Sequence, residues 1–207
     1  MTTQAAPVRR AKGEARERIV IEAAAALIAE RGLANLRMSD VAERAGMSAG
    51  HVTYYFPSKT SLLMRTIEYS ESSLHQEVAA NLQHIRDPWR RLYQLIESSA
   101  ATGRGDQGWV LWLEVWANAG LDDELAKFQA ELDARWRGTL TEVIRYGCER
   151  GNFVTDDPGA VSTLLSGLID GLSVHVTLGD EQMSGPTMME LCVRAAEALL
   201  KPGECSR

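Results

Sequence analysis

Cysteine is scarce in this chain of 207 residues, and its three cysteines lie far apart. Cys148, Cys192 and Cys205 show no CxxC spacing, so the sequence predicts neither a zinc site nor a disulfide framework. His75 and His84 have no cysteine or carboxylate neighbours at metal-ligand spacing. We therefore expect reduced thiols, no bound metal and no cofactor.

Catalytic motifs are also lacking, since no GxSxG, Walker A, GxGxxG or HExxH string occurs. The N-terminus, residues 1–18, is polar and basic, and no apolar segment behind it is long enough for a signal peptide or a membrane span. The sequence therefore predicts a soluble, cytoplasmic protein that is not an enzyme and does not enter a membrane.

Positive charge is in deficit overall, with a formal net charge of −6, but the deficit is uneven. Residues 1–65 contain ten Lys and Arg against six Asp and Glu, a balance of +4. The remaining 12 basic and 22 acidic residues give positions 66–207 a balance of −10. A basic N-terminal module on an acidic body suits a protein that presents one end to a phosphate backbone, although lopsided solvated faces are also common.

Residues 38–59 contain two short helical patterns separated by a tight break. Ser39 is expected to cap the first helix and Gly46 to end it, while Ser48 is expected to cap a second helix from Ala49 to Tyr55. A helix this short needs its neighbours for stability. This arrangement is typical of a helix-turn-helix whose second helix reads DNA.

Hydrophobic spacing predicts helices along the rest of the chain. The expected helices outside the short pair span 14–31, 59–83, 88–101, 109–120, 122–147, 160–178 and 187–200. The predicted fold is therefore all-α, with about nine helices. A three-helix DNA-binding domain with a basic N-terminal arm spans 1–58, and a larger helical ligand-binding and dimerisation domain spans 59–207. In the arm, we expect at least one of several basic residues to reach a phosphate, unless the arm is only a solubilising tail: Arg9, Arg10, Lys12, Arg16 and Arg18.

The last two predicted helices, 160–178 and 187–200, carry more apolar surface than one packing partner requires. In a symmetric homodimer each subunit would contribute both helices to a four-helix bundle. The alternative is that both helices are central in a monomeric core.

The stretch from Glu17 to Lys59 resembles the DNA-binding domain of the TetR family of bacterial transcriptional regulators. The family string after the turn, G-V-S-x-G-T-L-Y-x-Y-F-x-x-K, is matched at six positions, Gly46, Ser48, Gly50, Tyr55, Phe56 and Lys59, and Met47 stands at the place of its Val. Val52 replaces the usual Leu, His51 a frequent Thr, and Thr53 a frequent Tyr. Further on, WLEVWANAGLDDEL and LIDGL are similar to the subgroup containing the choline-responsive betaine-synthesis repressor.

The resemblance implies double-stranded operator DNA as partner and a set of candidate contacts around the second short helix. His51 and Thr53 fall on DNA-facing positions, Tyr54 is expected at the backbone, and Lys59 is expected to meet a phosphate at the start of the next helix. Tyr55 and Phe56 are expected to lock the helix onto the core. The full candidate set is Ser39, Ser48, Ala49, Gly50, His51, Thr53, Tyr54, Tyr55 and Lys59.

Aromatic residues supply the candidate ligand site. Trp109, Trp112 and Trp116 share one helix face, and Trp136 follows on the next helix. Stacked aromatics suit a flat or cationic ligand, but a stripe at helical spacing is more often core. Asp170 lies in a charge-poor helix, where a buried carboxylate needs a partner: a ligand, an Arg or a second subunit.

These observations predict a dimeric transcriptional regulator, a repressor released from DNA by an unknown small-molecule inducer and located with the nucleoid when bound. The helix at 59–83 would link the ligand domain to the reader. Two alternatives remain open: a constitutive or architectural DNA-binding dimer without a ligand, and a helical protein-interaction module.

Overall fold

The computed structural model describes residues 5–200, with the side chains of residues 5–12 and 75 excepted. Within that range the chain forms nine helices and no strand, which confirms the predicted all-α fold. They are α1 (Ala5–Arg31), α2 (Met38–Arg44), α3 (Ala49–Tyr55), α4 (Lys59–His84), α5 (Pro88–Ser99), α6 (Gln107–Ala119), α7 (Asp123–Glu149), α8 (Pro158–Leu178) and α9 (Gly185–Leu200). The side chains of Arg9, Arg10 and Lys12 in the predicted arm, and the whole of Cys205, lie outside the described residues.

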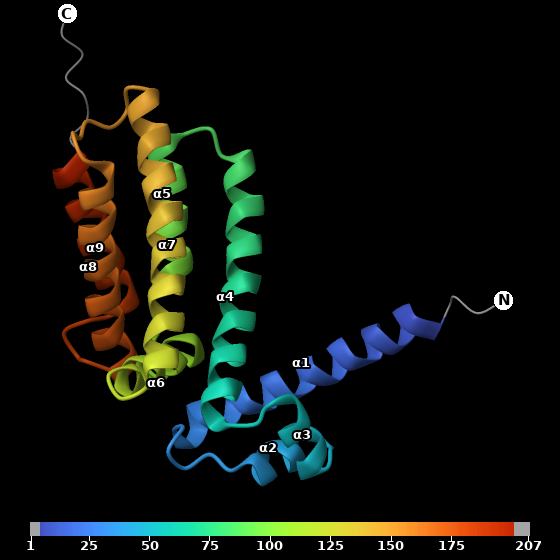
Figure 1. The fold of residues 1–207 in the computed structure, drawn as a ribbon. Coiled ribbons are helices and arrows are strands. Elements are labelled where there is room, and N and C mark those ends of the chain that lie inside the picture. Colours follow the sequence, from blue (N-terminus) through green and yellow to red (C-terminus); the bar gives the residue numbers. More distant parts are fainter. Residues whose placement is uncertain (1–4, 201–207) are drawn as a thin grey trace, which may run out of the picture.

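Helix α1 is longer than the sequence predicts, because it begins at Ala5 rather than at Glu14. The segment before Glu14 contains Pro7 and Gly13. Pro7 lies in the first turn, where its missing N–H has no helical acceptor to lose, and the helix continues through Gly13. The basic segment is thus the first part of a helix that projects away from the body (Figure 1).

Short polar side chains and glycines set several helix limits in the DNA-binding module, and those at Ser48 and Gly46 agree with the prediction. Ser48 Oγ accepts the backbone N–H of His51 at the start of α3, and Ser58 and Ser61 form a reciprocal capping box at the start of α4. Gly32 and Gly46 end α1 and α2 with φ of +75° and +65°, a left-handed conformation that strains other residues.

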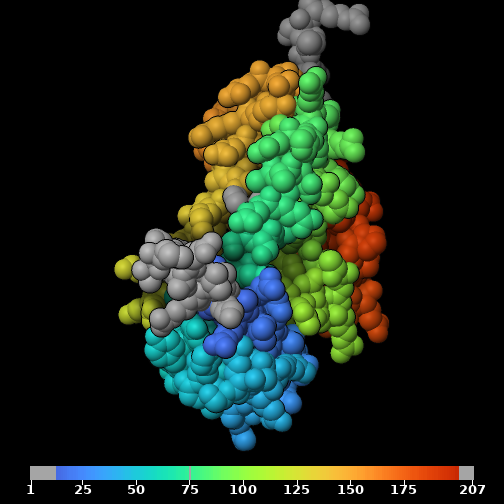
Figure 2. All heavy atoms as spheres, turned by 90° about the vertical axis from the view of Figure 1, so that its right-hand side faces the viewer, coloured from blue at the N-terminus to red at the C-terminus, as the bar shows by residue number. Residues whose placement is uncertain are grey.

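Two apolar clusters form the core, and α4, α6 and α7 contribute to both of them. The first surrounds α1, α2 and α3 and includes Leu62, Leu63 and Ile67 of α4 together with Leu111 and Val115 of α6. The second fills the body formed by α5, α7, α8 and α9. Figures 1 and 2 show the resulting arrangement, in which α1–α3 form one end of an elongated molecule and α4 runs from it along the body. The domain boundary at 58/59 stays a prediction.

Helix α8 is the one described helix with the length and mean hydropathy, 1.4, of a membrane span. It packs between α7 and α9, and 44% of its most apolar window is buried inside the protein. Leu164 and Leu178 on its outer side remain 58% and 65% exposed, beside the small residues Gly167 and Gly171. The apolar residues of α8 therefore serve an internal packing face and an outer face with no partner among the described residues.

Candidate DNA-binding surface and ligand cavity

The second short helix, α3, is anchored by one face and exposed on the other. Val52 and Phe56 are fully buried in the first apolar cluster, and the Tyr55 ring packs edge-on or tilted against its neighbours. The predicted anchoring role of Phe56 is thus confirmed. Ala49, Gly50, Thr53 and Tyr54 lie on the exposed side, and a Cβ at Gly50 would meet nothing within 4 Å.

Tyr54 is the most conspicuous side chain of that exposed side. The residue is 82% exposed, and its ring lies edge-on to that of Tyr55 with centroids 5.4 Å apart. A tyrosine that leaves its aromatic face and hydroxyl in water contributes little to folding, whereas both groups suit contacts to a phosphate backbone.

His51 is placed less simply than Tyr54. Its ring packs against Tyr55 with centroids 5.3 Å apart, and its Nε2 atom is buried without a hydrogen-bond partner among the described residues. In this ring orientation, the edge of the imidazole away from Nε2 is the one available to DNA. Thr53 Oγ1 donates to the carbonyl of Ala49 at 2.9 Å, which leaves its oxygen free to accept.

The role predicted for Ser39 as a helix cap is wrong. Helix α2 begins one residue earlier, at Met38, with Arg37 in the cap position and no side-chain cap. Ser39 Oγ instead donates to Asp40 Oδ1 at 3.2 Å, and the other Asp40 oxygen accepts from Arg31 Nη1 at 3.2 Å. The hydroxyl is thus engaged by a neighbouring carboxylate within the first turn, at an exposed position.

Lys59 lies in the first turn of α4, as predicted, but its ammonium has a partner that the sequence did not indicate. Lys59 Nζ donates to the carbonyls of Leu33 and Ala34 in the α1–α2 loop, at 3.4 and 3.1 Å. The same loop is held from the other side, because the Leu33 N–H donates to Glu114 Oε1 of α6 at 2.9 Å. Helices α4 and α6 of the body therefore both form hydrogen bonds to the α1–α2 loop of the DNA-binding module.

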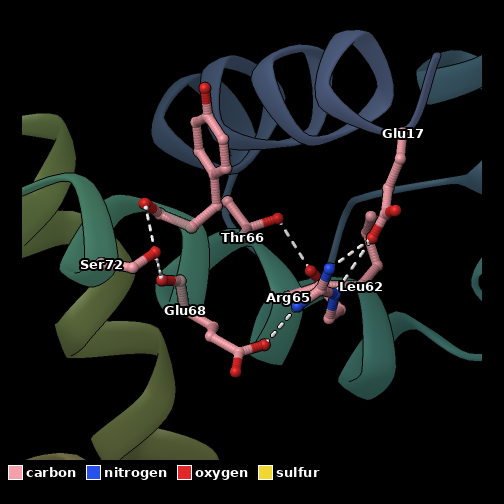
Figure 3. A network of polar contacts seen from close by, with 7 residues as sticks. Glu17, Leu62, Arg65, Thr66, Glu68 and Ser72 are labelled. Atoms are coloured by element: carbon pink, nitrogen blue, oxygen red, sulfur yellow. Dashed lines mark hydrogen bonds and ion pairs between the residues drawn. The ribbon is translucent and has the colours of Figure 1, made fainter. Parts of the chain in front are cut away.

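A second attachment joins α1 to α4 (Figure 3). Arg65 of α4 donates through Nε and Nη2 to Glu17 Oε1 of α1, at 3.1 and 2.6 Å, and also pairs with Glu68 one turn on. These interactions raise the pKa of Arg65, chiefly through its hydrogen bond to Glu17. The DNA-binding module is thus tied to α4 by a charge-assisted bond as well as by apolar packing.

The predicted ligand residues are brought together in one place. A cavity of about 200 Å³ is lined by Trp109, Trp112, Trp116, Trp136 and Asp170, all five of the residues proposed from the sequence. Its walls come from α4, the end of α5, the loop before α6, and α6, α7 and α8. A purely structural role therefore does not account for the four tryptophans, since each of them has a surface on this cavity.

Hydrogen bonds fix the orientation of two of these rings. Trp112 Nε1 donates to Glu71 Oε1 of α4 at 2.9 Å, and Trp109 Nε1 donates to the carbonyl of Ser99 at 3.1 Å. Trp116 lies 5.9 Å, between centroids, from both Trp109 and Trp112. Because the N–H groups of Trp109 and Trp112 donate to protein acceptors, the aromatic faces of these two indoles are left for other contacts.

Carboxylates complete the wall: Glu71, Asp106, Asp133 and Asp170. Burial and the nearby Asp133 raise the pKa of Asp170 to about 6, against the opposing effects of Arg137 and Ser166. For Asp106, burial is outweighed by hydrogen bonds from Thr102 and backbone N–H groups, so its pKa is lowered. No basic side chain lines this cavity among the described residues. The cavity thus favours a positively charged occupant.

Sequence reasoning missed Glu71, Asp133 and Glu114. Glu71 and Asp133 lie on helices with many charged residues, where a carboxylate normally faces water, and no local spacing marks them as cavity residues. Glu114 lies two residues from both Trp112 and Trp116, and its partner, Leu33, lies 81 residues away. These contacts are set by helix packing, which a single sequence does not reveal.

Residues 20–66 match the family described as bacterial regulatory proteins of the tetR family, and residues 88–201 match the BetI-type transcriptional repressor C-terminal family. Among curated relatives, the regulator BetI of Agrobacterium fabrum is 27% identical over 179 residues, 84% of each chain. BetI of Proteus mirabilis is 27% identical over 173 residues, which cover 82% of this chain and 84% of the relative.

Solved structures agree with these matches. A transcriptional regulator from Saccharomonospora viridis, crystallised in complex with choline, superimposes with a TM-score of 0.83 and 32% identity over 91% of this chain and 98% of its own. A TetR regulator from Haloarcula marismortui shares the fold alone, with a TM-score of 0.81 at 22% identity, over 91% of this chain and all of the other.

Proteins with this helix-turn-helix domain and this C-terminal domain are DNA-binding transcriptional regulators and not enzymes, and the present chain is one of them. It belongs to the TetR family, and its C-terminal domain is of the BetI type. The predicted helix-turn-helix and the predicted subgroup are thereby confirmed.

Proposed function

We propose that this protein is a homodimeric repressor, in the bacterial cytoplasm and on the nucleoid, that leaves its operator when a quaternary ammonium compound such as choline enters the cavity. One observation carries the ligand class: four tryptophans and four carboxylates converge on a single cavity of about 200 Å³. The choline complex of the Saccharomonospora viridis regulator supports the same class.

The cavity has the two properties that a trimethylammonium group requires. Aromatic faces attract a cation through their quadrupole, by about 0.5–2 kcal/mol per ring and most strongly for tryptophan. The methyl groups cannot donate strong hydrogen bonds, so indole rings are better partners than hydroxyls. The carboxylates of Asp133 and Asp170 would neutralise the charge that the ligand brings into a partly buried site.

Dimerisation through α8 and α9 would supply the second reader. The outer side of α8 presents Leu164 and Leu178 beside glycines, and Leu191 of α9 is 36% exposed. A four-helix bundle would bury these groups at an interface related by two-fold symmetry. Two copies of α3 would then have to lie about 34–36 Å apart to enter successive major grooves.

The proposed release mechanism uses α4 and α6, two helices that line the cavity and hydrogen-bond to the DNA-binding module. Helix α4 supplies Glu71 to the cavity wall. The same helix supplies Lys59 and Arg65, which hydrogen-bond to the α1–α2 loop and to Glu17 of α1. Twelve residues of helix, about 18 Å, separate Glu71 from Lys59, so a tilt of a few degrees at the cavity moves Lys59 by more than 1 Å. Helix α6 supplies three tryptophans and Glu114.

The direct test combines ligand binding with operator release. Choline titrated into the protein should change its tryptophan fluorescence, and the same concentrations should dissociate the protein from the promoter DNA beside its own gene in a gel-shift assay. A Trp116→Leu variant should lose the response to choline and keep the gel shift. A sequence-specific gel shift that no quaternary ammonium compound alters would refute the proposed induction.

A further inference from the structure

A second cavity adjoins the first. Its volume is about 220 Å³, and its walls come from α4, α5 and α7. The two cavities share four residues: Glu71, Leu74, Leu132 and Trp136. The shared residues place the two cavities next to each other, with Trp136 and Leu74 in the walls of both.

The second cavity differs from the first in charge. Arg135 lines it, and among the described residues that line either cavity Arg135 is the one basic side chain. Arg137, two residues after Arg135 on α7, forms an ion pair with Asp133 at 4.0 Å. Arg135 itself forms no ion pair with any described residue. The guanidinium of Arg135 is therefore available to an anionic group.

The polar side chains near Arg135 suit the same role. Gln76 carries an amide that can donate, and Thr139 carries a hydroxyl that already donates to the carbonyl of Arg135 at 3.2 Å. Glu71, on the shared wall, accepts from Trp112 and belongs with the carboxylates of the first cavity. Among the described residues, Asp106, Asp133 and Asp170 line the first cavity alone, Glu71 lines both, and Arg135 lines the second alone.

We propose that the two cavities form one site for a soluble zwitterion, with a quaternary ammonium group among the tryptophans and a phosphate or carboxylate at Arg135. This inference rests on the cation site proposed above. Arginine binds such anions through two parallel N–H donors, which gives both strength and orientation. Choline, which ends in a hydroxyl, would leave the second cavity without a charged partner.

The test compares choline with phosphocholine on the full chain by isothermal titration calorimetry, using the wild type, Arg135→Gln and a matched control, Arg145→Gln. Arg145 is an exposed arginine of the same helix that lines neither cavity. Wild type and Arg145→Gln should bind phosphocholine about tenfold more tightly than choline, as one charge-assisted pair allows. In Arg135→Gln this preference should disappear while choline affinity is unchanged.

The possible outcomes separate this inference from the proposed function. If choline binds but phosphocholine binds no more tightly, or if Arg135→Gln weakens both ligands equally, the two-part site is refuted and the cation site stands. If neither compound binds, both proposals fail. Phosphatidylcholine vesicles carry the same headgroup, and binding to vesicles without binding to free phosphocholine would overturn the assignment to a soluble ligand.

Discussion

At the scale of single residues, Asp170 should make the ligand affinity of the cavity depend on pH. Its carboxyl has a pKa of about 6 because of burial and of repulsion from Asp133. A cation binds the ionised carboxylate better than the neutral acid, so affinity for choline should rise as pH increases through 6. We expect choline to bind several-fold more tightly at pH 7.5 than at pH 5, as measured by calorimetry. In Asp170→Asn, affinity should be low and nearly flat with pH, whereas Asp156→Asn, a change at an exposed position, should keep the wild-type profile.

The exposed ring of Tyr54 gives a second prediction at this scale. Tyr54→Ala should weaken binding to operator and to unrelated DNA alike, by about tenfold, because a backbone contact carries no sequence information. Fluorescence anisotropy with two DNA sequences would measure this, and the melting temperature should not change since the residue is 82% exposed. Tyr93→Ala, at a half-exposed tyrosine of α5, is the control. A loss confined to the operator would assign Tyr54 to base reading.

Residue roles were predictable from the sequence where they depend on local spacing. The cap at Ser48 and the stop at Gly46 agree with the structure. The four tryptophans and Asp170 line one cavity, and their role in binding a ligand stays a prediction. Ser39 failed because a one-residue shift in helix start changes which side chain can cap. The partners of Lys59 were not predictable, because the loop carbonyls it binds lie 25 and 26 residues earlier.

At the scale of elements, α6 offers a direct route between cavity and reader. Its tryptophans line the cavity, and Glu114 on the same helix holds the Leu33 N–H of the α1–α2 loop. Glu114→Ala should leave choline affinity within about threefold of wild type, since Glu114 does not line the cavity, but should reduce the effect of choline on operator affinity about tenfold.

Paired titrations would measure this coupling, with operator affinity determined with and without saturating choline. Glu142→Ala, at an exposed position on α7, should retain wild-type coupling. Undiminished release in Glu114→Ala would show that the signal reaches the DNA-binding module by another route, such as α4 through Lys59 and Arg65.

At the scale of the whole molecule, DNA binding should depend on association of two copies. Leu164→Asp places a charge on the exposed outer side of α8, so it should convert the dimer to a monomer with little loss of helix content. Analytical ultracentrifugation would report the mass, and operator affinity should fall at least a hundredfold because one reader contacts one half-site.

Leu121→Asp is the matched control for this experiment, since Leu121 is 92% exposed and lies in the turn between α6 and α7. It should leave both mass and operator affinity unchanged. A Leu164→Asp protein that remains dimeric would place the interface elsewhere.

The elevated pKa of Asp170 also has a consequence for heat stability. A carboxyl whose pKa rises on folding binds its proton more tightly in the native state, so the ligand-free protein should lose stability as pH increases from about 4 to about 6. At neutral pH a cationic ligand compensates that loss. A ligand at a hundred times its Kd adds about 2.7 kcal/mol, which for a chain of this size raises the Tm by about 5–10 °C. Candidate inducers can therefore be ranked by melting curves alone, before any operator is known.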